Sequence, residues 1–255
     1  MASKKGIETT FRDYIKGFPS FFLAIQDIIN PSSITRLQLV SESLSDLLDK
    51  GGRNIKWEIH IPPTDPLKFK EFVRNGYRLE VQLNCDIRGT TPSLDSDELT
   101  IDEYKIEIWI RSLDKELSFR PYFDSKKICQ QLSKREWRRV ILSYHMDKRG
   151  VSAKVFEPIY HLHAGGRLAE QELCWIPKDL EEPRFYFFPL DIVLLSEFIL
   201  VNFEPKKHDE LRKTPEWRNQ VIRSQNLYLK PYIYQFYKYL EDNNYTLLNH
   251  LTKCY

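Results

Sequence analysis

The segment YRLEVQLNCDI, residues 77–87, is the clearest guide to the fold of this chain. Apolar side chains stand at every second position in it and alternate with charged or amide side chains. The same period of two returns in residues 103–111, EYKIEIWIR. This period is typical of a β-strand with one buried and one solvated face, which antiparallel sheets permit. We therefore expect both stretches to be antiparallel strands.

Shorter segments on either side extend this sheet. Residues 56–61 alternate around Trp57, and Pro62-Pro63 stops them. Two more strands are expected over residues 139–146 and 154–163, joined by a turn at 147–150. Residues 66–75 read as a short helix. The region 53–165 thus predicts an antiparallel sheet of four or more strands.

Helical spacing occupies both ends of the chain. Apolar residues recur every three or four positions over residues 8–49, with a break at Asn30-Pro31 that divides two helices. Later helices are expected from Pro189 to Phe203, from Thr214-Pro215 onward, and over residues 229–240. The predicted fold class is α+β: one domain, 1–255, with N-terminal helices (1–52), the sheet (53–165) and C-terminal helices (166–255).

Composition limits the class of protein. The chain has 255 residues, of which 42% are hydrophobic and 29% charged, as in ordinary folded proteins. Lys and Arg number 38 against 36 acidic residues, so bulk charge does not indicate a nucleic-acid binder. No Walker loop, dinucleotide fingerprint or Ser-His-Asp order is visible, and no cofactor is expected.

Location is predicted from what the sequence lacks. The N-terminus has no apolar core typical of a secretory signal, and no apolar run reaches 18 uninterrupted residues, so we expect no membrane association. Its four cysteines show no CxxC spacing, which argues against a disulfide framework or a cysteine zinc site. A reducing cytoplasm fits this pattern.

Residues 158–167, PIYHLHAGGR, carry the strongest chemical signal. On a strand, His161 and His163 share one face about 7 Å apart, and two imidazoles can act as an acid/base pair near neutral pH. Gly165 and Gly166 can form a nest of backbone N–H groups for a phosphate, which Arg167 could hold through two hydrogen bonds. The two imidazoles could also be metal ligands, but no third ligand is visible nearby, which weakens that alternative, and no metal residues are assigned. The alternative is that this segment is a purely structural turn.

A resemblance rests on these residues and the segments after them. His161-Leu162-His163-x-Gly-Gly, then Ile176-Pro177, then Pro189 and the helix around EFIL at 197–200 resemble a family of uncharacterised bacterial proteins. Those proteins share an H-L-H-x-G turn followed by a proline-started E-F-I-L-x-x-F helix. The segment is also similar to toxin proteins of bacterial toxin–antitoxin pairs, which carry H-x-H after a curved sheet. The likeness covers about residues 155–225 and implies a bacterial cytoplasmic protein of a defence or toxin locus.

Two further segments admit two interpretations each. Asp86 on one strand with Glu103-Tyr104-Lys105 on the next matches the Mg²⁺-dependent nuclease pattern, but also an ordinary solvated sheet face, and we leave this site open.

Residues 115–139 have five more basic than acidic side chains around Trp137. They suit a nucleic-acid backbone, or else form a solvated helix face. The candidate binding residues are Lys126, Lys127, Arg135, Arg138 and Arg139.

Two functions follow as hypotheses. The first is a defence or toxin-type effector acting on nucleic acid, an RNase-like phosphodiesterase in which His161 and His163 exchange the proton and Arg167 binds the phosphate. The alternative is a non-catalytic subunit or adaptor of a bacterial defence complex, whose partner is a neighbouring subunit or an antitoxin.

Overall fold

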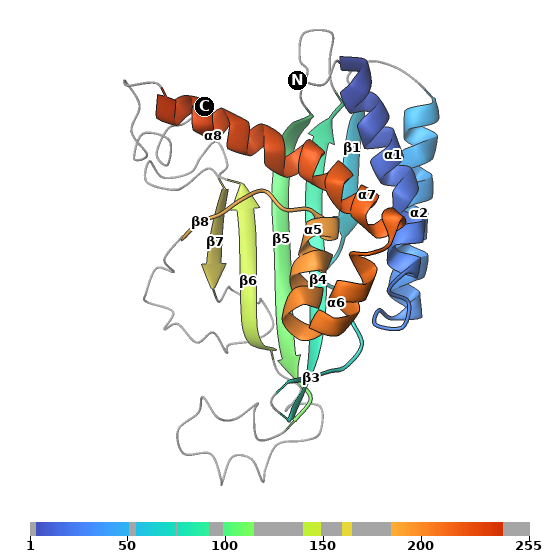
Figure 1. Cartoon of the computed structure of the whole chain (residues 1–255), viewed down its shortest axis with the longest axis vertical. Helices are drawn as coiled ribbons and strands as arrows, with labels where there is room; N and C mark the ends of the chain where they lie inside the picture. Colours follow the sequence, from blue (N-terminus) through green and yellow to red (C-terminus); the bar gives the residue numbers. More distant parts are fainter. Residues whose placement is uncertain are drawn as a thin grey trace.

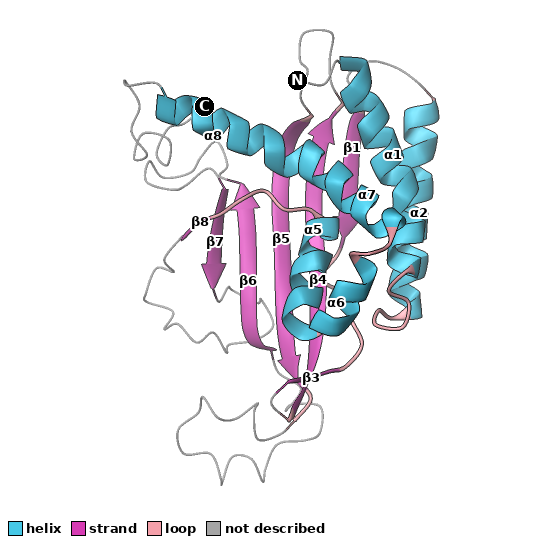
Figure 2. Ribbon diagram, in the orientation of Figure 1, coloured by secondary structure: helices cyan, strands magenta, loops and turns pink. Residues whose placement is uncertain are grey.

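The computed structural model describes residues 4–50, 55–74, 76–91, 99–114, 140–148, 160–164 and 185–241. In chain order the elements are α1 (Lys4–Leu23), α2 (Pro31–Asp49), β1 (Lys56–Ile61), β2 (Leu67–Lys68), β3 (Phe72–Arg74), β4 (Tyr77–Thr90), β5 (Thr100–Ser112), β6 (Val140–Lys148), β7 (Tyr160–Ala164), β8 (Phe185–Tyr186), α5 (Ile192–Phe203), α6 (Pro205–Leu211), α7 (Pro215–Ser224), the π-helical turn η1 (Gln225–Leu229) and α8 (Lys230–Glu241). Figure 1 shows them in sequence colours and Figure 2 by type.

One antiparallel sheet runs through the molecule in the order β1-β4-β5-β6-β7-β8. β4 is its longest strand. One edge of β4 pairs with β5, and the other pairs with β1, β2 and β3 in succession. The helices of both chain ends gather on one side of this sheet (Figure 1). The predicted α+β class, an antiparallel sheet flanked by N- and C-terminal helices, is confirmed.

The period of two separates the sheet into two faces. On β1 the residues alternate between exposed and buried, with Trp57, Ile59 and Ile61 in the core. β4 and β5 bury Val81 and Ile106 on this same side. Since paired residues lie on one side of a sheet, register gives all strands a common apolar face toward the helices.

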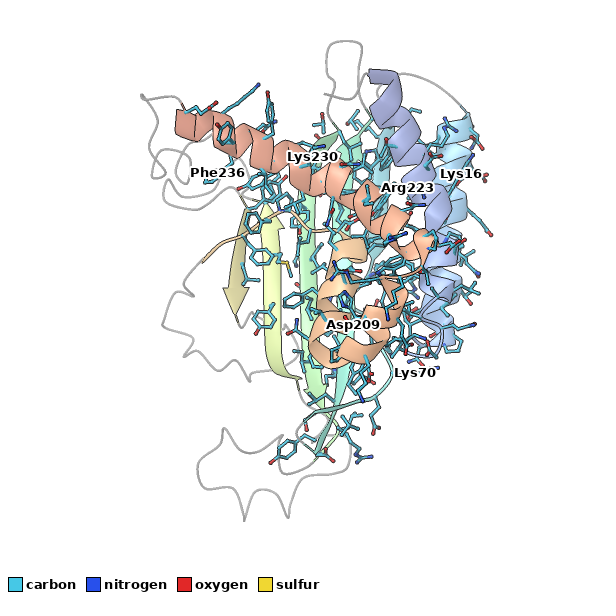
Figure 3. The ribbon with its side chains drawn as sticks, viewed as in Figure 1. Lys16, Lys70, Asp209, Arg223, Lys230 and Phe236 are labelled. Atoms are coloured by element: carbon cyan, nitrogen blue, oxygen red, sulfur yellow. The ribbon has the colours of Figure 1, made fainter. Side chains whose placement is uncertain are left out.

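Aromatic side chains fill the space between helices and sheet. α1 buries Phe11, Tyr14 and Phe18, and its Phe21 stacks on Trp217 of α7 with ring centroids 3.9 Å apart. Charged residues such as Lys16 and Asp209 lie on the outward helix surfaces (Figure 3). The two ends of the chain therefore share one hydrophobic core.

Three sequence predictions of local structure were wrong. Residues 66–75 are not a helix: β2 and β3 pair with β4, and Phe69 N–H donates to the Val81 carbonyl at 2.9 Å. The free edge of β4 satisfies backbone groups that a short isolated helix would leave exposed. β6 extends to Lys148, into the first half of the predicted turn at 147–150, because Asp147 and Lys148 pair with His161 and Tyr160; residues 149–159, the rest of that turn and the start of the predicted strand 154–163, lie outside the described part of the chain. α5 begins at Ile192 rather than Pro189, since the Asp191 side chain caps it.

Within the described residues, every helix is too short or too polar to cross a membrane.

Candidate functional site: the polar face of the sheet

The side of the sheet opposite the helix-facing core has a polar surface, which we call the polar face. Its members on the first strands include exposed, half-buried and buried side chains, and those on the edge strand β1 are exposed. They are Glu58, His60, Gln82, Asn84, Asp86, Arg88, Glu103, Lys105, Glu107, Trp109 and Arg111. Four of them are buried, namely Gln82, Asn84, Glu107 and Trp109, and buried polar groups normally need hydrogen-bond partners.

Strand register brings residues that are distant in the sequence into rows across this face. One row, here the central row, runs through Asn84, Glu107, His145 and His163 by successive backbone pairing of β4, β5, β6 and β7. Directly paired residues in antiparallel strands have Cβ atoms about 5 Å apart on one face of the sheet. The row thus contains two histidine positions, a carboxylate and an amide.

The neighbouring row begins at the edge strand. His60 pairs with Asp86, Asp86 with Lys105, Lys105 with Asp147, and Asp147 with His161. Lys105 links the two rows, because its Nζ lies 3.0 Å from Oε1 of Glu107. The Glu107 carboxylate, itself only 8% exposed, is held beside a cation.

Several buried polar atoms of the polar face have no hydrogen-bond partner among the described residues. They are Nδ2 of Asn84, Oδ1 of Asp86 and Nε1 of Trp109. Leaving a buried donor or acceptor unsatisfied costs about 1–3 kcal/mol, so such groups are rare and concentrate where a ligand or water completes the bonding. All three lie on the same side of two adjacent strands.

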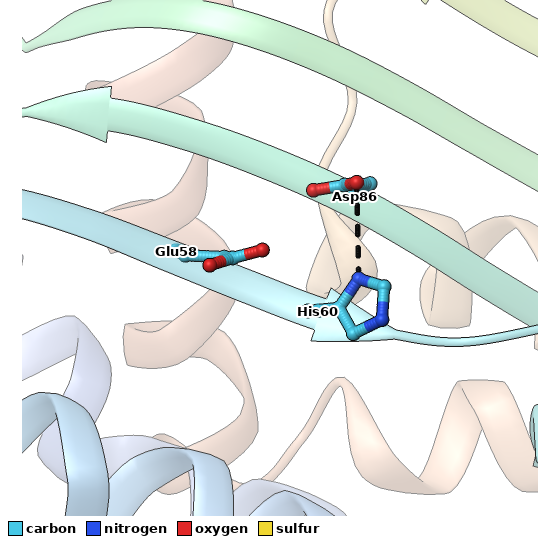
Figure 4. Close-up of side chains that lie close together, drawn as sticks. All are labelled: Glu58, His60 and Asp86. Carbon is cyan, nitrogen blue, oxygen red and sulfur yellow. Dashed lines mark ion pairs between the residues drawn. The ribbon is translucent and has the colours of Figure 1, made fainter.

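A cluster at the β1 edge has the composition of a metal site. One ligand atom from each of Glu58, His60 and Asp86 lies within 4.8 Å of the others, and Nδ1 of His60 is 3.8 Å from Oδ2 of Asp86 (Figure 4). β1 contributes Glu58 and His60 two residues apart, and β4 contributes Asp86 directly opposite His60.

Arg88 offsets part of the negative charge of this cluster. Its guanidinium donates to Oε1 of Glu58 at 3.0 Å, to Oδ2 of Asp86 at 3.1 Å and to Oε2 of Glu103 at 2.9 Å. The hydrogen bond to Glu58, followed by the charges of the neighbouring carboxylates, raises the pKa of Arg88. The carboxylates around Arg88 would also attract a metal cation.

A groove of about 980 Å³ opens beside the cluster, between α2 and the edge strand β1. Glu58, His60, Arg88 and Glu103 line its sheet side, and α2 lines the other with residues such as Leu39. Solutes can reach the cluster through this groove.

The nuclease pattern on β4 and β5 takes a different form from the expected one. Asp86 does pair with Lys105, and Glu103 lies on the same face opposite Arg88. Yet Arg88 stands between Asp86 and Glu103, and Lys105 contacts Glu107. Among the described residues, the group with metal-ligand spacing replaces Glu103 with Glu58 and His60.

The predicted catalytic and binding residues lie mostly outside the described part of the chain. His161 and His163 have backbone positions in β7, but their side chains are outside it. Their neighbours Tyr160 and Leu162 contact the hydrophobic core, as the alternation predicted. The remaining candidates fall outside the described residues altogether: Gly165, Gly166, Arg167, Lys126, Lys127, Arg135, Arg138 and Arg139.

Comparison of the chain with protein-family models, with curated proteins and with solved structures finds no match. Functional inference therefore rests on the residues themselves.

Sequence reasoning missed His60, Glu58 and His145. His60 lies within a short alternating strand, where a period of two indicates only an exposed position. A signal was nonetheless present, since Glu58-x-His60 places a carboxylate and an imidazole on one face of a strand. His145 becomes relevant only through its pairing with Glu107 and His163.

Proposed function

We propose that the protein cleaves phosphodiester bonds in nucleic acid, with RNA as the first substrate class, and that the polar face carries its active centre. The observation that supports this proposal is the central row. By strand register it aligns the backbone positions of His145 and His163, on separate strands, with Glu107, whose side chain is buried.

The chemistry needs two proton-transfer groups. One neutral imidazole takes the proton from the attacking hydroxyl, and one imidazolium gives a proton to the leaving oxygen. In this proposal His145 and His163 fill these roles, and Glu107 stabilises the charged form of the neighbouring imidazole.

The transition state also carries extra negative charge on the phosphoryl oxygens. Nδ2 of Asn84 is a buried donor without a partner among the described residues, at the β4 end of the central row. A preorganised donor of this kind stabilises developing negative charge. Arg167 and the Gly165-Gly166 pair remain predicted phosphate contacts on the β7 side.

The test is cleavage of labelled RNA and DNA oligonucleotides by the full chain. His163→Ala and His145→Ala should each lower kcat/KM by about 10²–10⁴-fold and leave the melting temperature nearly unchanged. His161→Ala, in the neighbouring row, reports whether both rows take part.

His208→Gln is the matched control. His208 is 4% exposed and its Nε2 lies 2.9 Å from Oε2 of Glu197, so its loss should lower stability and leave the rate per folded molecule unchanged. The proposal is wrong if His163→Ala melts several degrees lower and keeps full activity.

A second candidate function is that of a non-catalytic subunit or adaptor. Exposed apolar side chains on the C-terminal helices favour it, namely Phe198, Val201, Ile222 and Ile233. Absence of any cleavage by the parent protein, on RNA and DNA alike, would favour this candidate.

A further inference from the structure

From the edge cluster we infer a binding site for a divalent transition-metal ion of the zinc class, formed by Glu58, His60 and Asp86. This inference does not rest on the proposed nuclease function, because metal binding is measured without a substrate.

The ligand set matches this class of ion. Imidazole nitrogen with two carboxylate oxygens is a combination that zinc accepts, at bond lengths of about 2.0–2.2 Å. Three protein ligands leave a fourth position for water or a substrate atom. Magnesium and calcium prefer all-oxygen sites, so the imidazole selects against them.

The geometry needs only small side-chain movements. Tetrahedral ligands on bonds of that length lie about 3.4 Å apart, and the three ligand atoms here are already within 4.8 Å of one another. His60 and Glu58 are about half exposed, at 50% and 47%, so their rotamers can adjust. The backbones that carry them are fixed by the β1–β4 register.

A second observation points to a missing ligand. Oδ1 of Asp86 is buried and has no hydrogen-bond partner among the described residues, although Oδ2 contacts Arg88. A carboxylate held with one oxygen unsatisfied keeps unused capacity for a cation. The adjoining groove is lined by Glu58 and His60 and leads from solvent to these two of the three ligands.

Arg88 and the metal ion compete for the same carboxylates. The guanidinium donates hydrogen bonds to Glu58, Asp86 and Glu103, so Glu103 can retain it when a metal ion binds the other two carboxylates. Binding thus replaces a fixed monovalent cation by a divalent one. Because Arg88 competes with the metal, removing its charge should strengthen binding.

The experiment is titration calorimetry of the full chain with Zn²⁺ near neutral pH. The parent protein should bind one ion. Losing a partner that merely orients a ligand costs about 10–100-fold in affinity, so His60→Ala should lose at least about 100-fold. Arg88→Gln should bind about tenfold more tightly, an effect that two exposed ion pairs can supply.

Arg78→Gln is the matched control. Arg78 is also an exposed arginine of β4 but pairs with Asp114, 3.1 Å away at the far end of the strand, so its loss should not change Zn²⁺ affinity. Zn²⁺ should also raise the melting temperature of the parent protein and not that of His60→Ala.

Three results would overturn the inference: no Zn²⁺ binding by the parent protein, equal binding by folded His60→Ala, or weaker binding by Arg88→Gln than by the parent. None of them depends on nucleic-acid cleavage, so the metal site and the proposed function fail separately.

Discussion

Asp191 is the residue whose ionisation bears most directly on stability. Its carboxyl group is fully buried and accepts hydrogen bonds from Leu194 N–H at 2.9 Å, from Ser224 Oγ at 2.6 Å and from the Tyr14 hydroxyl. Burial raises the pKa of Asp191, and these hydrogen bonds offset only part of that shift. One side chain thus caps α5 and ties α1 to the C-terminal helices.

The pH dependence of stability follows from this shift. Above the ordinary Asp pKa of about 3.9 the unfolded chain loses this proton while the folded protein keeps it. The contribution of Asp191 to the free energy of unfolding therefore falls as pH rises from that value through the folded pKa, and is flat above it. Asp191→Asn removes the fall, so the variant should gain stability relative to the parent between pH 4 and pH 7.

Urea unfolding at the two pH values measures this difference. Asp209→Asn, which removes an exposed carboxylate of α6, gives the baseline for a change of charge alone. Parallel pH profiles of Asp191→Asn and the parent would show that burial of Asp191 does not control its protonation.

Among the helices, α7 packs the C-terminal part of the chain against α1. Trp217 is 1% exposed, stacks on Phe21 of α1 and donates from Nε1 to Glu197 of α5. Trp217→Ala should lower the free energy of unfolding by about 3–5 kcal/mol, since it removes a large buried ring and leaves a cavity. Ile222→Ala on the same helix is 51% exposed and should cost less than about 0.5 kcal/mol. Equal losses in urea titrations would contradict this packing.

At the scale of the whole molecule, charge is nearly balanced overall but unevenly distributed along the chain. Residues 115–139 hold a surplus of five positive charges within a net charge of +2. If they bind nucleic acid, reversing Arg135, Arg138 and Arg139 to Glu should weaken binding to single-stranded RNA. The slope of the logarithm of the binding constant against the logarithm of the salt concentration should become less negative by about 0.7 for each lost phosphate contact.

Fluorescence anisotropy at several salt concentrations measures both effects. The matched control reverses three exposed basic residues of the helical side: Lys206, Arg212 and Lys213. It changes net charge equally, so an equal loss of binding would assign the effect to bulk charge and remove the 115–139 segment from the interface.

The alternation of β4 and β5, the helices at both ends and the α+β class could all be predicted from the sequence. These features can be predicted because they depend on the order of apolar and polar residues within one short segment. A period of two indicates a strand, and a period of 3.6 a helix, with one face against an apolar core. The same period of two places Glu58, His60 and Asp86 on the side of the sheet opposite the apolar core.

The pairing of the strands and their register could be read from the folded structure and not from the sequence. Residues 66–75 have local helical character, but the free edge of β4 offers them backbone partners that no short window of sequence reveals. The edge cluster joins residues 26 to 28 positions apart, and the central row spans residues 84 to 163. Register is set by long-range pairing, and a shift of one residue would move every one of these side chains to the other face. The metal cluster and the histidine row therefore exist only in the folded sheet.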